Sequence, residues 1–487
     1  MTWPIADRDA AGSLGRALRE LSYDEDSVDA LLDDEVRGAA PRDVPVYERR
    51  LDASPLATAV RLFLLELPVT RGALEEAVGG NGAAAVLRIG LAQEQDGLLV
   101  PRSRLLPVEG LLLAFDHFSR GDDDPEGYVA AYSPTASWLA ALTPRRRVQR
   151  ALDVGTGNGI HALLASRHAA RVVATDVNDR ALAYTELNAA LNGIANVEPR
   201  KGSLFEPVAG ETFDLITCNA PYVVSPERRW QYRDAGLPAD EVSQRVVEGC
   251  ASALAAGGFA SMLVSWVAES RDDPDVRLDE WLDGTGCDAW VLGLSGADPL
   301  DHAAGWNEHL AEDRQAFAAA LDEWVEYFER LGVEWISEGA VLLHKRAARQ
   351  QTIRADDVDE DELEYAGDQI ERAFAARALL DRLPDRKAVL ETRFTLADAV
   401  EIEHRRGDGT DEARLVLDEG THAEVVVDLD AADVLAALDG RLTLGDAVDR
   451  IAKRLELSRS GTTQLRRDVV AATVELFELG MAELVDA

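Results

Sequence analysis

Short apolar runs alternate with helical patterns in the middle of the chain, from residue 145 to about residue 346. This alternation predicts βα units built around a parallel sheet. The predicted strands are Arg150 to Val154, Arg171 to Thr175, Phe213 to Cys218, Phe259 to Trp266, Ala289 to Leu294, and Val333 to His344 with an interruption near Gly339. A helical insertion at about 296–331 separates the last two strands, and we expect its aromatic residues to pack in a core.

The N-terminal part, residues 1–120, follows a different pattern. One or two amphipathic surface helices are expected before residue 50, and helical spacing begins again at Pro55. Pro68 and the glycine-rich turn Gly79 to Gly82 divide this second stretch into three short helices. Two apolar runs, 97–101 and 111–115, could then pair as a hairpin. Three helices followed by a hairpin resemble a winged helix, but Arg88 is the only basic residue of the third helix, so a packing or docking module is favoured over DNA reading.

The C-terminal part, residues 349–487, opens with a run of acids between Asp356 and Glu364, which predicts a linker or the start of a solvated helix. Two strands, two helices and a final short strand are expected beyond it. These elements are 413–417, 424–429, 444–455, 464–479 and 482–485. Their order suggests a second winged-helix-like domain that serves as an interaction surface.

Composition places the chain among ordinary globular proteins. It has 487 residues, 47% hydrophobic and 29% charged, which is enough for two to four domains. No apolar stretch is long enough to span a bilayer and no secretory signal is visible at the N-terminus, so we expect a cytoplasmic protein without a membrane partner. The three cysteines and eight histidines show no disulfide or metal-binding spacing, and no metal is expected.

The net charge of −39 is the most unusual bulk property. Such a surface repels phosphate backbones, so a nucleic-acid partner would require a local basic patch. The only compact basic cluster is Arg145, Arg146, Arg147 and Arg150. It could neutralise a helix end or contact RNA, and neutralisation of a helix end is the favoured interpretation.

The strongest chemical signal is the segment 151–160, where an apolar strand runs into the glycine-rich turn Asp153-Val154-Gly155-Thr156-Gly157-Asn158-Gly159. Glycines allow a sharp turn and a close approach to a ligand, and the helix that follows presents free N–H groups. Asp176 lies 21 residues after Gly155, at the end of the next predicted strand, where a carboxylate can accept ribose hydroxyls. A nucleotide-like ligand is therefore expected on this turn.

This turn resembles motif I of class I S-adenosylmethionine-dependent methyltransferases, since an acid precedes the glycines inside the strand. The resemblance covers about residues 128–346 and implies a Rossmann-like, seven-stranded α/β domain, which we expect over residues 121–348. It also implies that Asp153, through the turn, holds the methionine end of the cofactor and that Asp176, followed by Val177, holds the ribose. Ser203 and Leu204 are placed at the adenine, although the family usually has an acid where this chain has Ser203.

The fourth predicted strand ends in Asn219-Ala220-Pro221-Tyr222. This segment resembles the Asn/Asp-Pro-Pro-Tyr/Phe motif of methyltransferases that act on planar nitrogen. The Asn219 side chain and the Ala220 carbonyl would accept the two N–H bonds of an amide or amine, and Tyr222 would stack on the planar group. Ala220 replaces the first proline of the motif, but Pro221 still restricts Ala220 to extended geometry.

Three further groups of residues are weaker candidates. Tyr132, Pro134 and Ser137 resemble a segment that covers the cofactor in glutamine methyltransferases, although Thr135 and Ser137 could equally cap the helix that follows. Tyr232, Arg233 and Asp234 lie where a substrate loop is expected. His161 is interpreted as a local polar residue and not as a base.

The sequence therefore predicts an S-adenosylmethionine-dependent N-methyltransferase that acts on a macromolecule. A protein glutamine, as in a release-factor loop, is the preferred acceptor because net charge disfavours RNA. An adenine N6 or guanine N2 of ribosomal or transfer RNA is the alternative. A cofactor-binding scaffold, impaired at Ala220 and Ser203, is the second alternative. The oligomeric state is left open.

Overall fold

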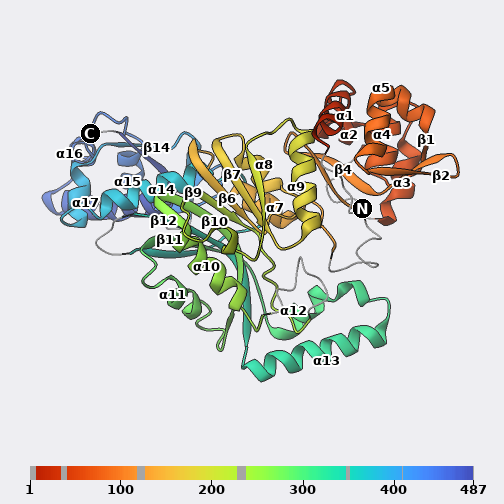
Figure 1. Ribbon diagram of the computed structural model, residues 1–487. Coiled ribbons are helices and arrows are strands. Elements are labelled where there is room, and N and C mark those ends of the chain that lie inside the picture. The colour runs from red at the N-terminus through yellow and green to blue at the C-terminus, as the bar shows by residue number, and fades with distance from the viewer. Residues whose placement is uncertain are drawn as a thin grey trace.

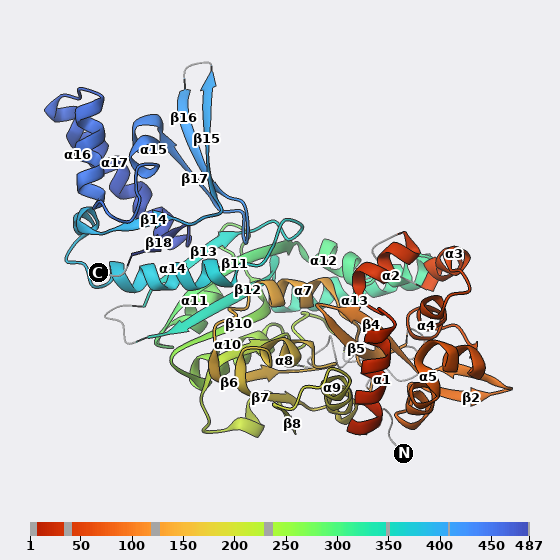
Figure 2. The same cartoon turned by 90° about the horizontal axis from the view of Figure 1, so that it is seen from above.

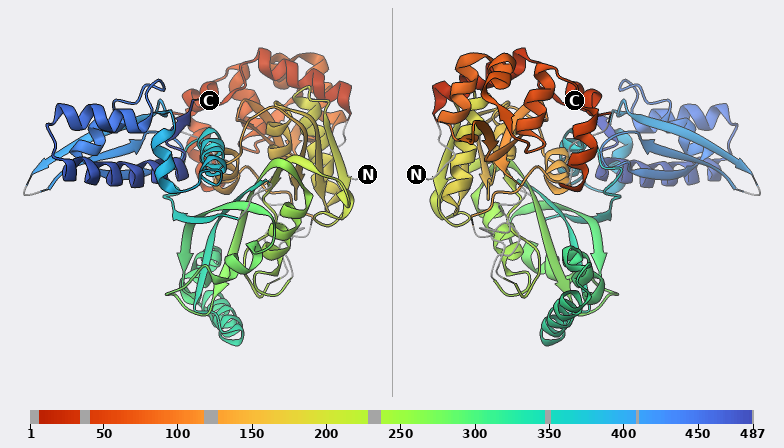
Figure 3. Two further views of the ribbon diagram at one scale, coloured as in Figure 1. Left: turned by 90° about the vertical axis from the view of Figure 1, so that its left-hand side faces the viewer. Right: turned by 90° about the vertical axis from the view of Figure 1, so that its right-hand side faces the viewer.

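The computed structural model of the protein describes residues 7–33, 41–117, 127–227, 237–346, 351–407 and 410–485. A central sheet lies between an N-terminal group of helices and a C-terminal domain, which occupy opposite sides of the view in Figure 1. A pair of helices inserted in the central domain projects away from both terminal parts (Figure 3).

The central sheet has the strand order β13-β11-β12-β10-β9-β6-β7-β8. Its strands are β6 (Val148–Val154), β7 (Ala169–Asp176), β8 (Val197–Lys201), β9 (Phe213–Cys218), β10 (Leu254–Ala268), β11 (Cys287–Ala297), β12 (Trp335–Lys345) and β13 (Ile353–Asp357). Only β12 runs antiparallel to its neighbours in this sheet. β6 is the first strand of this sheet along the chain. β7 and β8 follow on one side of it, and β9 and β10 lie on its other side, so the strand order reverses between β6 and β9 and creates a topological switch point there.

Eight strands are present in this sheet instead of the seven expected, because β13 adds to the edge beside β11. It comes from the stretch predicted as an acidic linker, and this prediction was wrong for Asp356 and Asp357. Both acids belong to a strand that alternates between exposed and half-buried residues, so it carries no apolar run to reveal it.

The central strands are nearly continuous apolar runs because helices cover both faces of the sheet. On one face lie α7 (Pro134–Ala141), α8 (Ile160–Ala165) and α14 (Gly367–Leu380). On the other face lie α10 (Glu241–Ala253) and α11 (Val276–Leu282). The interruption expected near Gly339 is absent, since β12 is one continuous strand there. A Cβ at Gly339 would lie 2.3 Å from the Leu292 carbonyl oxygen, so glycine lets the strands approach.

The predicted helical insertion consists of α12 (Pro299–Trp306), the short 3₁₀ helix η4 (Glu308–Leu310) and α13 (Arg314–Leu331). Trp324 and Phe328 of α13 are fully buried, and they pack with Val224 and Val267 of the central domain. The aromatic residues of the insertion therefore form a small core, as their spacing predicted.

The N-terminal part contains mainly short helices and two small sheets. Its elements are α1 (Arg8–Glu20), α2 (Glu25–Leu32), η2 (Pro41–Asp43), α3 (Val44–Arg50), α4 (Pro55–Phe63), β1 (Val69–Thr70), α5 (Arg71–Arg88), β2 (Ala92–Gln95), β3 (Leu98–Pro101), β4 (Ser103–Val108) and β5 (Leu111–Asp116). The predicted turn at Gly79 to Gly82 is a single kink at Gly79, where φ is 72°. The predicted pairing of 97–101 with 111–115 was wrong, because β3 pairs with β2 and β5 pairs with β4. Whether this part is a winged helix stays a prediction.

The β4–β5 hairpin is attached to α9 (Asp179–Leu191) of the central domain by side-chain amides. Asn188 Oδ1 accepts from the Ala114 N–H and Asn188 Nδ2 donates to the Ala114 carbonyl, both at 2.8 Å. Asn192 makes the same pair of bonds to Leu112, at 2.9 and 2.8 Å. The two amides thus act as a neighbouring strand would at the edge of β5.

The C-terminal part begins with α14, whose apolar side packs on the central sheet, so the domain boundary predicted at residue 349 does not separate two cores. The remaining elements are η5 (Arg386–Glu391), β14 (Phe394–Leu396), β15 (Val400–Gly407), β16 (Thr410–Leu417), β17 (Glu424–Asp428), α15 (Leu429–Leu435), α16 (Leu444–Arg454), α17 (Arg459–Glu478) and β18 (Ala482–Leu484). The β15–β16 hairpin extends away from the body of the protein (Figure 2). Within the described residues, no helix has the length and apolar character needed to cross a membrane.

Candidate active site

The glycine-rich turn follows the carboxyl end of β6, next to the switch point. Gly155, Gly157 and Gly159 have φ angles of 69°, 55° and 89°, in the left-handed region that favours glycine. A Cβ at Gly155 would lie 3.3 Å from the Ala220 Cα. The turn after β6 and the segment after β9 therefore meet at the carboxyl edge of the sheet.

Asp153 is buried beneath this turn and holds it in place. Its Oδ2 accepts from Thr156 Oγ1 at 2.6 Å and from the Ala162 N–H at 3.1 Å, and its Oδ1 accepts from Thr217 Oγ1 at 3.0 Å. Burial raises the pKa of Asp153 to about 6, and the hydrogen bonds from Thr156 and Thr217 oppose this shift. Both Asp153 and the Thr156 side chain thus shape the turn from inside the protein.

Asp176 ends β7 and faces the same turn. Its Oδ2 accepts from the Gly157 N–H at 2.9 Å, and its Oδ1 accepts from the Asn178 N–H at 2.8 Å. Burial raises the pKa of Asp176, and these backbone hydrogen bonds oppose the shift. Val177, the next residue, is 41% exposed.

The segment after β8 lies beside the end of β7. The Gly202 N–H donates to the Asp176 carbonyl at 3.0 Å, and Thr175 Oγ1 donates to the Leu204 carbonyl at 3.1 Å. Ser203 is exposed, while Leu204 is partly buried against the core on the α10 side of the sheet. The structure therefore brings Ser203 and Leu204 to the sheet edge that carries the glycine turn.

Asn219 and Tyr222 follow β9 at this same edge. Asn219 is half-buried, and its Nδ2 lies 3.5 Å from Thr135 Oγ1 at the start of α7. Ala220 is buried, and Ser265 Oγ of β10 donates to the Tyr222 carbonyl. Burial raises the pKa of Tyr222 well above its usual value, and the nearby Glu338 adds to this shift.

The segment before α7 closes one side of the site. Asn158 Nδ2, in the glycine turn, donates to the Ala130 carbonyl at 2.9 Å, and the Tyr132 hydroxyl donates to Glu109 at 3.1 Å. Pro134 begins α7, and the helix is capped by Ser133, whose Oγ accepts from the Ala136 N–H. The cap predicted at Thr135 or Ser137 was therefore wrong; Ser137 lies within the helix.

Residues 134–267 match the family described as "Methyltransferase small domain". This stretch contains the glycine turn, Asp176 and the Asn219–Tyr222 segment. Residues 134–267 are therefore similar to a methyltransferase small domain. A separate stretch, residues 20–102, matches a "Domain of unknown function (DUF7059)".

Curated proteins similar to the central domain include two glutamine methyltransferases. The release factor glutamine methyltransferase of Deinococcus radiodurans is 37% identical over 141 residues, which cover 26% of this chain and 50% of the relative. The ribosomal protein uL3 glutamine methyltransferase of Bradyrhizobium diazoefficiens is 30% identical over 218 residues, covering 41% of this chain and 61% of the relative. The chain thus spans about half to three fifths of the length of these two relatives.

Solved structures resemble parts of the chain. Trm5b from Pyrococcus abyssi has a TM-score of 0.31 and 15% sequence identity, over 53% of this chain and 62% of that one. The ribosomal protein L11 methylase of Lactobacillus delbrueckii subsp. bulgaricus has a TM-score of 0.26 and 18% identity, over 45% of this chain and 81% of that one.

Several residues of the candidate site were missed by sequence reasoning. Thr217 and Ser265 lie inside strands. Thr217 donates to Asp153 on the neighbouring strand β6, and Ser265 of β10 donates to the Tyr222 carbonyl. Glu338 sits opposite Ser265 in the β10–β12 register, and its Oε1 accepts from Trp306 Nε1 at 3.3 Å. Burial raises the pKa of Glu338. Only knowledge of the strand pairing would have connected these residues.

The remaining sequence candidates have different outcomes. Tyr232, Arg233 and Asp234 lie outside the described residues. Across the described ranges, no group of three His, Cys, Asp or Glu side chains has the geometry of a metal site. Of the basic cluster, Arg150 pairs with Glu211 and Arg145 stacks on Tyr365 at 4.2 Å.

Proposed function

We propose that this protein is an S-adenosylmethionine-dependent methyltransferase that modifies a planar nitrogen, with a protein glutamine side chain as the preferred acceptor. The observation that carries this proposal is the meeting of two segments at the switch point. The Asn219–Tyr222 segment lies against the glycine turn, with Ala220 in close contact with Gly155. A nitrogen held by the first segment would therefore lie beside a cofactor held by the second.

The residues at the turn fit S-adenosylmethionine. The Asp176 carboxylate has about four acceptor positions, so it can keep its backbone bonds and still accept a ribose hydroxyl. The position where Gly157 would carry a Cβ has no atom within 4 Å, so a ligand can approach its backbone closely. Asp153 would act indirectly, by fixing the turn. When bound, S-adenosylmethionine supplies a methyl group carried on a positively charged sulfur.

Asn219 and Ala220 would position the acceptor. The Nδ2 group of Asn219 faces Thr135, which leaves Oδ1 as a hydrogen-bond acceptor. Oδ1 and the Ala220 carbonyl can accept the two N–H bonds of a primary amide and so fix the direction of its nitrogen. The tie between Ser265 and the Tyr222 carbonyl holds the backbone of this segment to β10. These residues bind and orient the amide, and no strong general base is needed in this scheme.

Two arguments favour a protein acceptor. The relatives named above are described as acting on a release factor and on a ribosomal protein. The net charge of −39 opposes association with RNA, whereas a protein loop need not be repelled. The terminal parts of the chain would then provide docking surfaces for the acceptor protein.

The test is transfer of labelled methyl from S-adenosylmethionine to the proteins and RNA of a cell extract. We expect label that protease removes and nuclease does not, and at least a tenfold loss with Asn219→Ala. Asn81→Ala, at an exposed position of α5, is the matched control and should retain full transfer. Label that nuclease removes would show that RNA, and not a protein glutamine, is the acceptor. Transfer that does not depend on Asn219 would refute the assigned site.

A further inference from the structure

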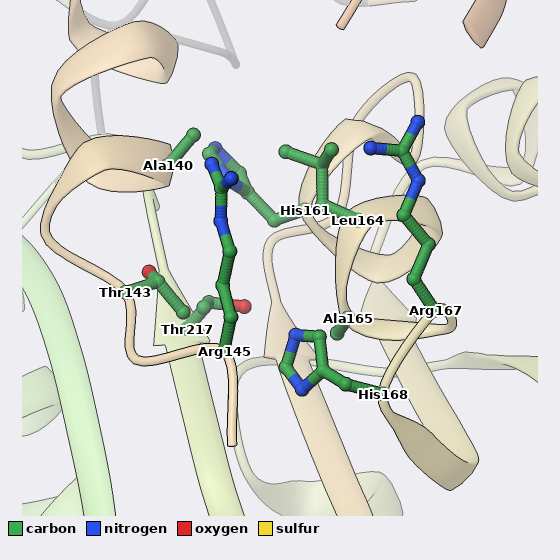
Figure 4. A pocket seen from close by; sticks show the side chains of 9 residues that line it. All are labelled: Ala140, Thr143, Arg145, His161, Leu164, Ala165, Arg167, His168 and Thr217. Carbon is green, nitrogen blue, oxygen red and sulfur yellow. The ribbon is translucent and has the colours of Figure 1, made fainter. Parts of the chain in front are cut away.

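A cavity of about 230 Å³ lies on the α7–α8 side of the sheet (Figure 4). Its floor includes Thr217 of β9, and its walls come from the end of α7, the loop that follows, and α8 with the residues after it. The lining residues are Ala140, Thr143, Arg145, His161, Leu164, Ala165, Arg167, His168 and Thr217.

The charged residues of this cavity lie at the sheet edge opposite the proposed cofactor site. Arg145 precedes β6, and Arg167 and His168 immediately precede β7, so all three stand at the amino ends of parallel strands. The glycine turn and Asn219 follow the carboxyl ends of β6 and β9. The charged residues of the cavity therefore lie away from the proposed cofactor site, while its floor at Thr217 adjoins Asp153 beneath the glycine turn.

The cavity is basic in a strongly acidic protein. Two of its nine lining residues are arginines, two are histidines and none is acidic. Burial lowers the pKa of His168, and the positive charges of Arg145 and Arg167 lower it further. The two arginines are therefore close enough to His168 for their charges to act on its ring. Contacts restrict both arginine side chains. The Arg145 guanidinium carbon lies 4.2 Å from the centroid of the Tyr365 ring, and Arg167 donates to the Glu109 carbonyl.

His161 adds an unpaired polar group to the wall. Its side chain lines the cavity from α8 and the residue is only 5% exposed, yet Nε2 has no hydrogen-bond partner among the described residues. Buried polar atoms of native proteins are nearly always paired, so this nitrogen is available to a partner inside the cavity. Burial lowers the pKa of His161 to about 4, so its ring is neutral at pH 7.

We propose that this cavity binds a small oxyanion, a carboxylate or phosphate group carried by a compact molecule. The guanidinium groups of Arg145 and Arg167 match the planar geometry of such anions. His161 Nε2 can donate a hydrogen bond to the anion, while Ala140, Leu164 and Ala165 accommodate a short apolar portion. The cavity volume of about 230 Å³ favours a compact ligand.

Titration calorimetry of the full-length protein tests this proposal, with sodium phosphate and sodium benzoate as separate probes at constant ionic strength. We expect saturable binding of at least one probe, weakened about tenfold or more by Arg145→Gln and by Arg167→Gln. Arg147→Gln is the matched control, because Arg147 is exposed two residues from Arg145, does not line the cavity and changes net charge equally. Far-UV circular dichroism confirms that each variant is folded.

A second measurement reports on the cavity directly. In protein labelled with ¹³C-histidine, the probe that binds should shift the His161 ring resonance, and Arg145→Gln should abolish the shift at the same probe concentration. Benzoate binding alone would assign an organic carboxylate as the ligand class, and phosphate binding alone would assign a phosphate compound. The proposal fails if neither probe binds at 50 mM, or if Arg147→Gln weakens binding as much as Arg145→Gln does.

Discussion

The Asp153 carboxylate of β6 accepts a hydrogen bond from the Thr217 hydroxyl of β9 at 3.0 Å. This contact adds to the backbone pairing between the strand that leads into the glycine turn and the strand that leads into Asn219. Because Asp153 also accepts from Thr156 and from the Ala162 N–H, it fixes the turn, the start of α8 and β9 relative to one another.

Thr217→Val should destabilise the protein by about 1–3 kcal/mol, because it removes a buried donor to a carboxylate while keeping the shape of the side chain. Chemical denaturation measures this loss. Thr463→Val, at an exposed position of α17, is the matched control and should change the unfolding free energy by less than ~0.5 kcal/mol. Equal effects of the two substitutions would contradict a role for the Thr217 contact.

Ionisation of Asp153 should lower the free energy of unfolding as pH rises from about 4 to 7. Its pKa is raised to about 6 in the folded protein, against about 3.9 when unfolded, so the folded state holds the proton more tightly. The stabilisation is complete below pH 4 and is lost as pH passes through 6, by on the order of 3 kcal/mol. The unfolding free energy of wild type minus that of Asp153→Asn, measured across pH 3.5 to 8, should decline over this window. A difference that stays flat or increases would show that Asp153 is not perturbed in this direction.

Gly155→Ala should impair both stability and methyl transfer. Gly155 has φ of 69°, and a new Cβ would press on Ala220, displacing the segment that carries Asn219. Displacements of about 1 Å near reacting groups can lower rates ~100-fold. Gly193→Ala is the control, because φ is 68° there but no atom lies within 4 Å of the new Cβ. It should cost about 1 kcal/mol of stability and leave transfer intact; equal transfer by both variants would rule out the Gly155–Ala220 contact as a constraint.

Asp116→Asn should cost about 3–5 kcal/mol, because it removes the negative charge from a buried ion pair with Arg180. The Asp116 side chain is fully buried and also accepts from the Tyr184 hydroxyl at 2.9 Å, joining β5 to α9. Urea denaturation measures the loss. Arg171→Gln breaks the exposed pair with Glu198 and should cost less than ~1 kcal/mol. A loss below 1 kcal/mol for Asp116→Asn would mean that this pair does not hold the N-terminal part in place.

The central strands and the two motifs were predictable from the sequence because their physical causes are local. A parallel strand covered on both faces is an apolar run, and β6, β7 and β9 were found in this way. The carboxyl ends of parallel strands share one edge, so Asp176 and Asn219 could be placed beside the glycine turn from their positions after strands alone.

Edge strands and contacts between strands could not be predicted. β13 and β15 are rich in charged residues and show no apolar run. The pairing of β5 with β4, and not with β3, follows from the two-residue turn Glu109-Gly110, where both φ angles are positive, and the apolar runs alone did not reveal this turn. Glu338 enters the site because β12 runs antiparallel beside β10, which places it opposite Ser265. Such neighbours are determined by topology and not by spacing along the chain.

The amides of Asn188 and Asn192 occupy the backbone groups along the outer edge of β5. An open edge of this kind invites a strand from another molecule, and natural proteins block it by charge, bulges or cover. Here the cover is supplied by a helix from the adjoining domain. The contact that attaches the N-terminal part therefore also guards against aggregation, and a fragment that contains the hairpin but lacks α9 would expose a ready template for intermolecular β-pairing.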